Sequence, residues 1–364
     1  MNAEEREGRR SRIIPEILRA GSMINNHATV IAGWGATEVL FDRRVCLGLT
    51  SCRFFLYEKN YVHINGRMAM ALFTGAGVAL ITPMKEDGSV SYEKLAEIIE
   101  FQIDNGTDSI IICGTTGEAA TLTVEEHIKV IRFCCEQVKG RIPVVAGTGS
   151  NCTRSAIDLS REAENAGADG LLCVTPYYNK ATQSGLEAHF KALADSVGIP
   201  VILYNVPSRT GCNIKAETAA RIFAASDNVV GIKEATGDMS QVASLMNLTD
   251  GKIDLYSGND DQIVPIMSLG GKGVISVFSN VAPREAHEIP TDFLEGRTAD
   301  ALAKQMKALP LMNALFCEVN PIPVKHAMNL MGMEVGPLRM PLSPMEPKNL
   351  ERLRAEMVNY GLIK

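Results

Sequence analysis

The sequence contains no apolar run that approaches the roughly 20 residues a transmembrane helix requires, so no membrane span is predicted. Its nine cysteines form no C-x-x-C pair, and its six histidines follow no ligand spacing, which argues against a disulfide framework and against a metal site. Acidic residues outnumber basic ones by 42 to 36 without a basic stripe, so we expect no nucleic-acid partner. With 46% apolar and 21% charged residues, the chain has the composition of a globular enzyme, and the odd number of cysteines without a secretory signal predicts reduced thiols and a cytoplasmic location.

Residues 1 to 70 differ in composition from the remainder of the chain. They contain the single tryptophan, Trp34, and an arginine-rich start. A transit peptide is poor in acidic residues, so Glu4 and Glu5 argue against one, and no apolar core of a signal peptide is present. We therefore predict that residues 1–70 are an N-terminal extension, either disordered or the product of an over-extended start.

From residue 71 onward, short apolar runs alternate with helical patterns. The runs lie at Gly77–Thr82, Ser109–Cys113, Pro143–Ala146, Gly170–Val174, Pro200–Tyr204, Val229–Lys233, Ile253–Ser257 and Gly273–Val277. Eight such units predict an α/β fold, a closed (β/α)8 TIM barrel over residues 71–297. The main alternative is an open doubly wound sheet, but no G-x-G-x-x-G turn follows the first strand. We also expect no cofactor.

Local signals support the intervening helices. Thr123 and Glu126 have the spacing of a capping box, and Ser184 and Glu187 repeat it. Pro290 predicts a kink or break in the helix after the eighth strand. Beyond residue 298 the strand patterns cease, and helical patterns at 301–306, 324–330 and 350–360 predict a C-terminal helical appendage over residues 298–364.

Lys233 ends the sixth predicted strand. Burial in an apolar strand would lower the pKa of its amine and leave a neutral nucleophile that can attack a carbonyl carbon. This favours Schiff-base chemistry. The alternative is a strand-capping lysine that reaches water, because lysines are almost never fully buried. The segment alone leaves both open.

Further polar residues fall at the ends of other predicted strands, where a barrel of this type has its active site. They are Thr115 and Thr116 after the second strand, Tyr177 and Tyr178 after the fourth, Tyr204 at the end of the fifth, and Arg209 shortly after it. Threonine hydroxyls and an arginine can hold carboxylates, and tyrosines can relay protons. Each of these residues, taken alone, could equally be part of a tight turn or pack in the core. Together they predict one site.

Several of these segments resemble motifs of the pyruvate-dependent Schiff-base aldolases, the N-acetylneuraminate lyase and dihydrodipicolinate synthase superfamily. The segments are Gly114-Thr115-Thr116-Gly117-Glu118, Tyr204-Asn205-Val206-Pro207 and Gly231-Ile232-Lys233-Glu234-Ala235-Thr236. Within the superfamily, Thr175–Asn179, Ser208–Gly211 and Asn320–Lys325 look like the synthase branch. The resemblance runs from about Phe73 to the C-terminus.

The resemblance implies a reaction. Lys233 would condense with pyruvate, and the resulting enamine would attack L-aspartate 4-semialdehyde to give 4-hydroxy-tetrahydrodipicolinate, in lysine and diaminopimelate biosynthesis. Tyr204 would act as general acid and base, linked through Thr115 to Tyr178. In the family this tyrosine enters the site of a neighbouring subunit. A dimer would then be the smallest catalytic unit, paired into a homotetramer.

The resemblance also implies substrate contacts. Thr116 would hold the pyruvate carboxylate and Arg209 the carboxylate of the semialdehyde. Gly258 and Ile275 match positions that line the pocket, with the Ile275 carbonyl near the lysine. Two alternatives remain: a lyase for a 2-keto-3-deoxy sugar acid or for N-acetylneuraminate, which would not depend on Arg209, and a catalytically silent binding protein on the same barrel.

Regulation by lysine yields a prediction from the sequence. Asn151, Tyr177 and His127 match the site where many family members bind lysine at a subunit interface. Val124 and Ser155 stand where the inhibited members have a histidine and a glutamate. Loss of the carboxylate removes a partner for the ligand's ammonium group, so we expect weak or absent inhibition when lysine is titrated into an activity assay. Inhibition by sub-millimolar lysine would contradict this expectation.

Overall fold

The computed structural model describes residues 63–64, 67–68 and 71–364. The chain divides into two units, Met1–Met70 and Ala71–Lys364. In the first unit, strands β1 (His63–Ile64) and β2 (Arg67–Met68) pair antiparallel. The extension predicted for residues 1–70 otherwise lies outside the described residues.

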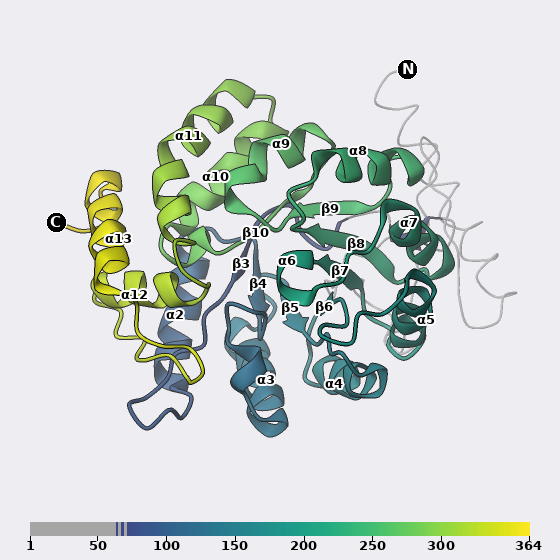
Figure 1. The fold of residues 1–364 in the computed structure, drawn as a ribbon, viewed down its shortest axis with the longest axis horizontal. Coiled ribbons are helices and arrows are strands. Elements are labelled where there is room, and N and C mark those ends of the chain that lie inside the picture. The colour runs from purple at the N-terminus through teal and green to yellow at the C-terminus, as the bar shows by residue number, and fades with distance from the viewer. Residues whose placement is uncertain (1–62, 65–66, 69–70) are drawn as a thin grey trace, which may run out of the picture. The chain divides into compact units, whose positions relative to one another are not determined.

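Residues 71–364 contain a closed barrel of eight parallel strands (Figure 1). The strands are β3 (Gly75–Ala79), β4 (Ser109–Ile112), β5 (Val144–Gly147), β6 (Gly170–Val174), β7 (Val201–Asn205), β8 (Val229–Glu234), β9 (Asp254–Ser257) and β10 (Gly273–Ser276). They follow one another around the barrel in chain order, and β10 pairs with β3 to close it. Each strand overlaps one of the predicted apolar runs, so the (β/α)8 prediction is confirmed.

Helices surround the strands (Figure 1). They are α2 (Tyr92–Asp104), α3 (Val124–Val138), α4 (Thr153–Asn165), α5 (Gln183–Ala194), α6 (Pro207–Thr210), α7 (Ala216–Ala225), α8 (Met239–Leu248), α9 (Ile263–Ser268) and α10 (Pro283–Leu294). Short 3-10 turns are η2 (Ala119–Thr121), η3 (Asp260–Gln262) and η4 (Phe278–Asn280). The C-terminal helices are α11 (Thr298–Ala314), α12 (Ile322–Leu330) and α13 (Pro347–Tyr360). Helix α11 packs on α10, and α13 packs on α11 and α12, as expected for a helical appendage.

The closure of the barrel depends on a close backbone approach between the first and last strands. Gly273 of β10 pairs with Gly75 of β3. A Cβ on Gly273 would lie 1.8 Å from the carbonyl oxygen of Gly75, so no other residue fits there without moving the backbone. Buried aliphatic side chains, such as Ile110, Ile202 and Leu255 with no exposed surface, fill the space on both sides of the strands.

The helix-capping predictions have different outcomes. Thr123 and Glu126 form the predicted capping box at the start of α3. The second box is wrong, because α5 begins one residue before Ser184 and its N-cap is Thr182. The Thr182 hydroxyl accepts a hydrogen bond from the Gly185 amide at 3.2 Å, so Ser184 already lies within the first turn.

The helix after the eighth strand is not broken at Pro290. Helix α10 continues through Pro290 to Leu294, so a break is excluded, and the alternative of a kink stays a prediction. Ile289 and Pro290 are both buried, and α10 packs against β3, α9 and α11. Tertiary packing on several elements compensates for the single backbone hydrogen bond that proline removes. Among the described residues, no helix is long and apolar enough to cross a membrane.

Candidate active site

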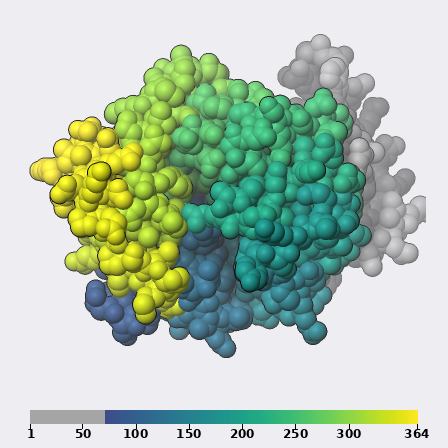
Figure 2. All heavy atoms as spheres, in the orientation of Figure 1, coloured from purple at the N-terminus to yellow at the C-terminus, as the bar shows by residue number. Residues whose placement is uncertain are grey.

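A cavity of about 700 Å³ opens at the C-terminal ends of the strands. Its lining combines residues from the loops after β4, β5, β6 and β7 with residues that precede α12. Figure 2 shows the corresponding hollow in this face, bordered by blue and teal barrel residues and by yellow-green residues of the C-terminal helices. This is the end of a parallel barrel at which loops and helix starts meet, so it is the expected position for a binding site.

Lys233 lies in β8 with its side chain only 6% exposed. It pairs in register with Tyr204 of β7, and its Nζ lies 4.5 Å from the centroid of the Tyr204 ring. Burial lowers the pKa of Lys233 to about 7, with Asp260 opposing this shift and Arg209 adding to it. About half of such amines are neutral at pH 7. The alternative of a capping lysine that reaches water is therefore wrong.

Tyr204 connects the lysine to the cavity, which it lines together with Thr115. Burial raises the pKa of Tyr204, whereas Arg209 and a hydrogen bond with the Thr115 hydroxyl lower it. The phenol therefore remains protonated near neutral pH. It lies between a nucleophilic amine and a hydroxyl, which is the position a general acid and base requires.

Thr116 and Arg209 are brought together through Asn320. The Asn320 amide Nδ2 donates to Thr116 Oγ1 at 3.0 Å, and the Asn320 carbonyl accepts from Arg209 Nη2 at 3.2 Å. Arg209 lies in α6, which begins at Pro207, and its exposed side chain lines the cavity. Arg209 therefore offers a guanidinium at the cavity wall, which suits a ligand with a carboxylate group, whereas Thr116 is 3% exposed and does not line the cavity.

Comparison with known proteins places these features in a family. The profile of the Dihydrodipicolinate synthetase family matches residues 72–359. The chain belongs to this family. It is 63% identical over 294 residues to the 4-hydroxy-tetrahydrodipicolinate synthase of Lachnoclostridium phytofermentans, covering 81% of this chain and 100% of that protein. It is 55% identical over 295 residues to the synthase of the same name from Clostridium tetani, with 81% and 100% coverage.

Solved structures show the same relationship. The chloride-inhibited dihydrodipicolinate synthase from Acinetobacter baumannii, complexed with pyruvate, has 45% identity and a TM-score of 0.78 over 80% of this chain and 99% of that one. A monomeric dihydrodipicolinate synthase variant has 43% identity and a TM-score of 0.78, with 80% and 98% coverage. The enzyme from Cyanidioschyzon merolae with lysine bound has 38% identity and a TM-score of 0.79, with 81% and 100% coverage.

Of the other positions suggested by the family resemblance, Gly258 lies against the lysine. A Cβ there would be 3.2 Å from Lys233 Cε and 2.6 Å from the Ala235 Cβ, so the absence of a side chain gives the lysine its space. Ile275 is buried in β10, which is separated from β8 by β9. Neither residue lines the cavity.

Tyr178 does not join the other family positions within one chain. Its side chain is 89% exposed, and it does not line the cavity that contains Thr115. Its backbone has a φ of +74°, and its amide donates to the Thr210 carbonyl at 3.3 Å. The neighbouring Tyr177 does line the cavity. The tip of this loop thus presents one tyrosine to the site of its own chain and one outward.

The positions that match the family's lysine site are only partly assembled in one chain. His127 and Tyr177 line the same cavity as Thr115, together with Val124. The His127 Nε2 is 2.8 Å from the Gly147 carbonyl, and burial lowers the pKa of this imidazole. Asn151 does not line the cavity.

Two residues near the site were missed at the level of sequence. Asn320 begins a segment that resembles the synthase branch, but the resemblance gives it no role in the site, and Asp260 stands in a loop between two other polar residues without a motif. Asp260 is buried, and its Oδ2 accepts hydrogen bonds from the Val277 and Phe278 amides at 3.1 and 2.9 Å. Burial raises the pKa of this carboxyl. No local pattern indicates either role.

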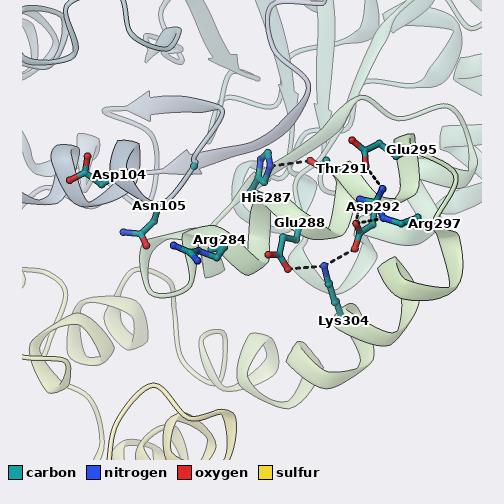
Figure 3. Close-up of a pocket in the computed structure, with 11 residues that line it drawn as sticks. Asp104, Asn105, Arg284, His287, Glu288, Thr291, Asp292, Glu295, Arg297 and Lys304 are labelled. Atoms are coloured by element: carbon teal, nitrogen blue, oxygen red, sulfur yellow. Dashed lines mark hydrogen bonds and ion pairs between the residues drawn. The ribbon is translucent and has the colours of Figure 1, made fainter.

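A second depression lies beside the end of α2, along α10 and α11, and Figure 3 shows its charged lining. Lys304 lies 2.7 Å from both Glu288 and Asp292, and Arg297 donates to Asp292 at 2.9 Å. These charges are paired with one another, so we interpret the depression as surface structure. Over residues 71–364, no group of three or more His, Cys, Asp and Glu side chains could hold a metal ion.

The amine of Lys233 should titrate near pH 7. Burial and the nearby Arg209 disfavour the charged form, so we expect a half-titration near pH 7, against about 10.4 for an ordinary lysine. The measurement is an NMR titration of protein labelled at the lysine Cε, with the Lys233 resonance assigned by its absence from Lys233→Met. Replacement of Arg209 by methionine should move the titration upward. A midpoint near 10 in the native enzyme would refute the assignment.

Proposed function

We propose that the protein condenses pyruvate with L-aspartate 4-semialdehyde to form 4-hydroxy-tetrahydrodipicolinate, through a Schiff base on Lys233. The observation that carries the proposal is the buried amine of Lys233, with a pKa of about 7, against the Tyr204 ring. Relatives at 63% and 55% identity bear the name of this activity. The activity is a step of lysine and diaminopimelate biosynthesis, and the protein is a lyase of the Schiff-base aldolase type.

The chemistry begins with the neutral amine of Lys233. The amine attacks the ketone carbon of pyruvate, and loss of one water gives the imine. Loss of a proton from the pyruvate methyl group turns the imine into an enamine, whose carbon attacks the aldehyde of the semialdehyde. The amine of the semialdehyde then attacks the imine carbon, closes the ring and expels Lys233, which is thereby ready for another turnover.

Tyr204 is the proposed general acid and base for these proton transfers. It lies beside Lys233 and has a hydrogen bond with Thr115, which supports a relay through the threonine hydroxyl. The relay needs one further group that exchanges protons with solvent. We assign it to Tyr178 of a neighbouring subunit, because this tyrosine is exposed in its own chain.

Two groups are proposed to bind the carboxylates of the substrates. Thr116 and the backbone amides of its loop would hold the carboxylate of pyruvate. The related enzyme from Acinetobacter baumannii has been solved in complex with pyruvate. Arg209 would bind the carboxylate of the semialdehyde, and its position at the exposed cavity wall supports this. Ile275 and Gly258 would complete the base of the pocket beside Lys233.

The quaternary structure follows from the proposed relay. We propose a homotetramer built as a dimer of dimers, in which each tight dimer supplies Tyr178 across its interface. The 89% exposure of this tyrosine leaves its side chain available to a second chain, which supports the proposed role. One of the related structures is of a monomeric dihydrodipicolinate synthase variant.

The remaining proposals concern organisation and regulation. We propose that the second unit divides into a barrel over residues 71–297 and a helical appendage over residues 298–364. We propose a cytoplasmic location, which the unpaired, buried thiols of Cys113, Cys134 and Cys173 support. Weak lysine inhibition also remains a proposal. A homologue at 38% identity is known with lysine bound, and here Ser155 is exposed and lines the cavity.

Borohydride trapping with pyruvate tests the main proposal. Reduction should convert the imine into a stable secondary amine, so peptide mapping by mass spectrometry should find the pyruvate adduct on Lys233. Labelling should require pyruvate and should be absent from Lys233→Met. A folded, native protein that acquires no label, or acquires it on another lysine, would show that the proposed chemistry is wrong.

Replacement of Arg209 by alanine tests the second substrate. Loss of a charged hydrogen-bonding group should lower kcat/KM for the semialdehyde on the order of a hundredfold, while pyruvate still labels Lys233. Arg221→Ala is the matched control, because Arg221 is paired with Glu187 on the outer helices. A sugar-acid lyase would not depend on Arg209, so unchanged kinetics would contradict the assignment.

Mixed oligomers test the role of Tyr178. Tyr178→Phe and Lys233→Met should each be nearly inactive alone. In a mixed dimer, one site combines an intact Lys233 with an intact Tyr178 from the other chain, so statistical mixing should restore activity to about a quarter of the native sites. Differently tagged variants that co-purify without any recovered activity would place Tyr178 outside the neighbouring site.

A further inference from the structure

The loop that carries Thr115 and Thr116 is attached to the C-terminal appendage at two residues, Thr116 and Glu118. This 114–118 loop follows β4, and its partners come from residues 320 to 339, roughly two hundred positions later in the chain. Such contacts are not required to close the barrel, whose hydrogen bonds are complete between its own strands. They therefore call for a separate explanation.

The first attachment is through Asn320. Its amide donates to Thr116 Oγ1 at 3.0 Å, and the bond is buried, with Asn320 itself 5% exposed. The Asn320 carbonyl accepts from Arg209 Nη2 at 3.2 Å. One residue thus contacts both of the groups proposed to bind carboxylates. It does so in separable ways, because the side chain holds Thr116 and the backbone holds Arg209.

The second attachment is a buried ion pair at Glu118, the last residue of the loop. Lys325 Nζ lies 2.7 Å from Glu118 Oε1, and the two side chains are 1% and 0% exposed. Glu118 Oε2 accepts from the Arg339 amide at 2.9 Å, and Lys325 also donates to the Pro337 carbonyl at 2.6 Å. Glu118 has a φ of +54°, a conformation that costs free energy for a residue with a side chain.

The energetics favour a positional role for this pair. Two charges lose their hydration on burial, and a pair of apolar side chains of similar volume would stabilise the fold as well or better. What the pair supplies is geometry: it holds a strained residue of the loop at a defined distance from α12. The hydrogen bond from Asn320 likewise holds Thr116, two residues earlier in the loop, at a defined distance from the start of α12.

We propose that Asn320 and Lys325 make the C-terminal helices a positioning element for the 114–118 loop, so that binding of the 2-oxo acid carboxylate depends on a segment outside the barrel. Neither residue needs to touch the substrate. The inference rests on the proposed function, in which Thr116 and its loop hold the carboxylate of pyruvate.

Substitutions of Asn320 provide the sharper test. Asn320→Ala removes the bond to Thr116 but keeps the backbone bond to Arg209, so KM for pyruvate should rise by about five- to tenfold while KM for the semialdehyde changes little. Asn320→Asp preserves size but places a negative charge beside the carboxylate site, and it should raise KM for pyruvate further. Asn329→Ala is the matched control, because its bond to the Gly336 carbonyl stays within the appendage.

A merely structural Asn320 would give the opposite order. The near-isosteric Asn320→Asp would then behave more like the native enzyme than Asn320→Ala, or both KM values would move together with stability. Either result, or an unchanged KM for pyruvate in Asn320→Ala, would overturn the proposal.

The ion pair is tested by a double-mutant cycle. Lys325→Met leaves a buried carboxylate without its partner and should destabilise the protein, whereas Lys325→Met combined with Glu118→Gln should regain much of the lost stability. The positioning role predicts that the double variant keeps a raised KM for pyruvate. Recovery of the native KM together with stability would show that the pair only stabilises the fold. If Lys325→Met fails to fold, the Asn320 variants still decide the proposal.

Failure of this inference and failure of the proposed function are distinguishable. Borohydride trapping of the native enzyme with pyruvate reports on the function without any substitution at the appendage. Labelled native enzyme with unaltered pyruvate kinetics in the Asn320 variants refutes the inference alone. Native enzyme without label refutes the function, and the inference with it.

Discussion

The desolvation of one amine is the constraint on which the rest of this site depends. Lys233 is held in an interior strand with 6% of its surface exposed, and its pKa falls to about 7 as a result. Burial destabilises the charged form of the amine, so a fraction of it is neutral at pH 7. The Tyr204 ring and the carboxylate of Asp260 partly offset the loss of hydration of the charged form. An amine held this way is a nucleophile at neutral pH, whereas an exposed one is a solvated cation.

The parallel barrel supplies the neighbours of that amine. Adjacent strands β7 and β8 run in register, so Tyr204 and Lys233 are cross-strand partners and their side chains emerge on the same face. The loop after β4 adds Thr115 to the phenol, and α6 adds Arg209 at the cavity wall. A closed ring of strands brings all four together at one end, although each comes from a different part of the barrel sequence.

The C-terminal helices belong to the same site. Their contacts with the 114–118 loop are made by a buried amide, Asn320, and by a buried ion pair, which are directional interactions suited to setting positions. The side chain of Tyr178, by contrast, is exposed and does not line the cavity of its own chain. The catalytic arrangement is therefore distributed over the barrel, the appendage and, in the proposed assembly, a second chain.

The sequence by itself determined the eight strands and the TIM barrel, because apolar periodicity is a local property of the chain, and its strand-end motifs predicted the residues of a lysine-centred site. It failed on two details of the helices: α10 is not broken at Pro290 because packing holds it, and Thr182 caps α5 in place of Ser184 because its backbone is extended where the helix begins. Only the tertiary structure decided that Lys233 is buried, that Asn320 reaches Thr116 and that Tyr178 faces outward. Burial and long-range hydrogen bonds depend on what the rest of the chain places around a residue, and no local pattern encodes that.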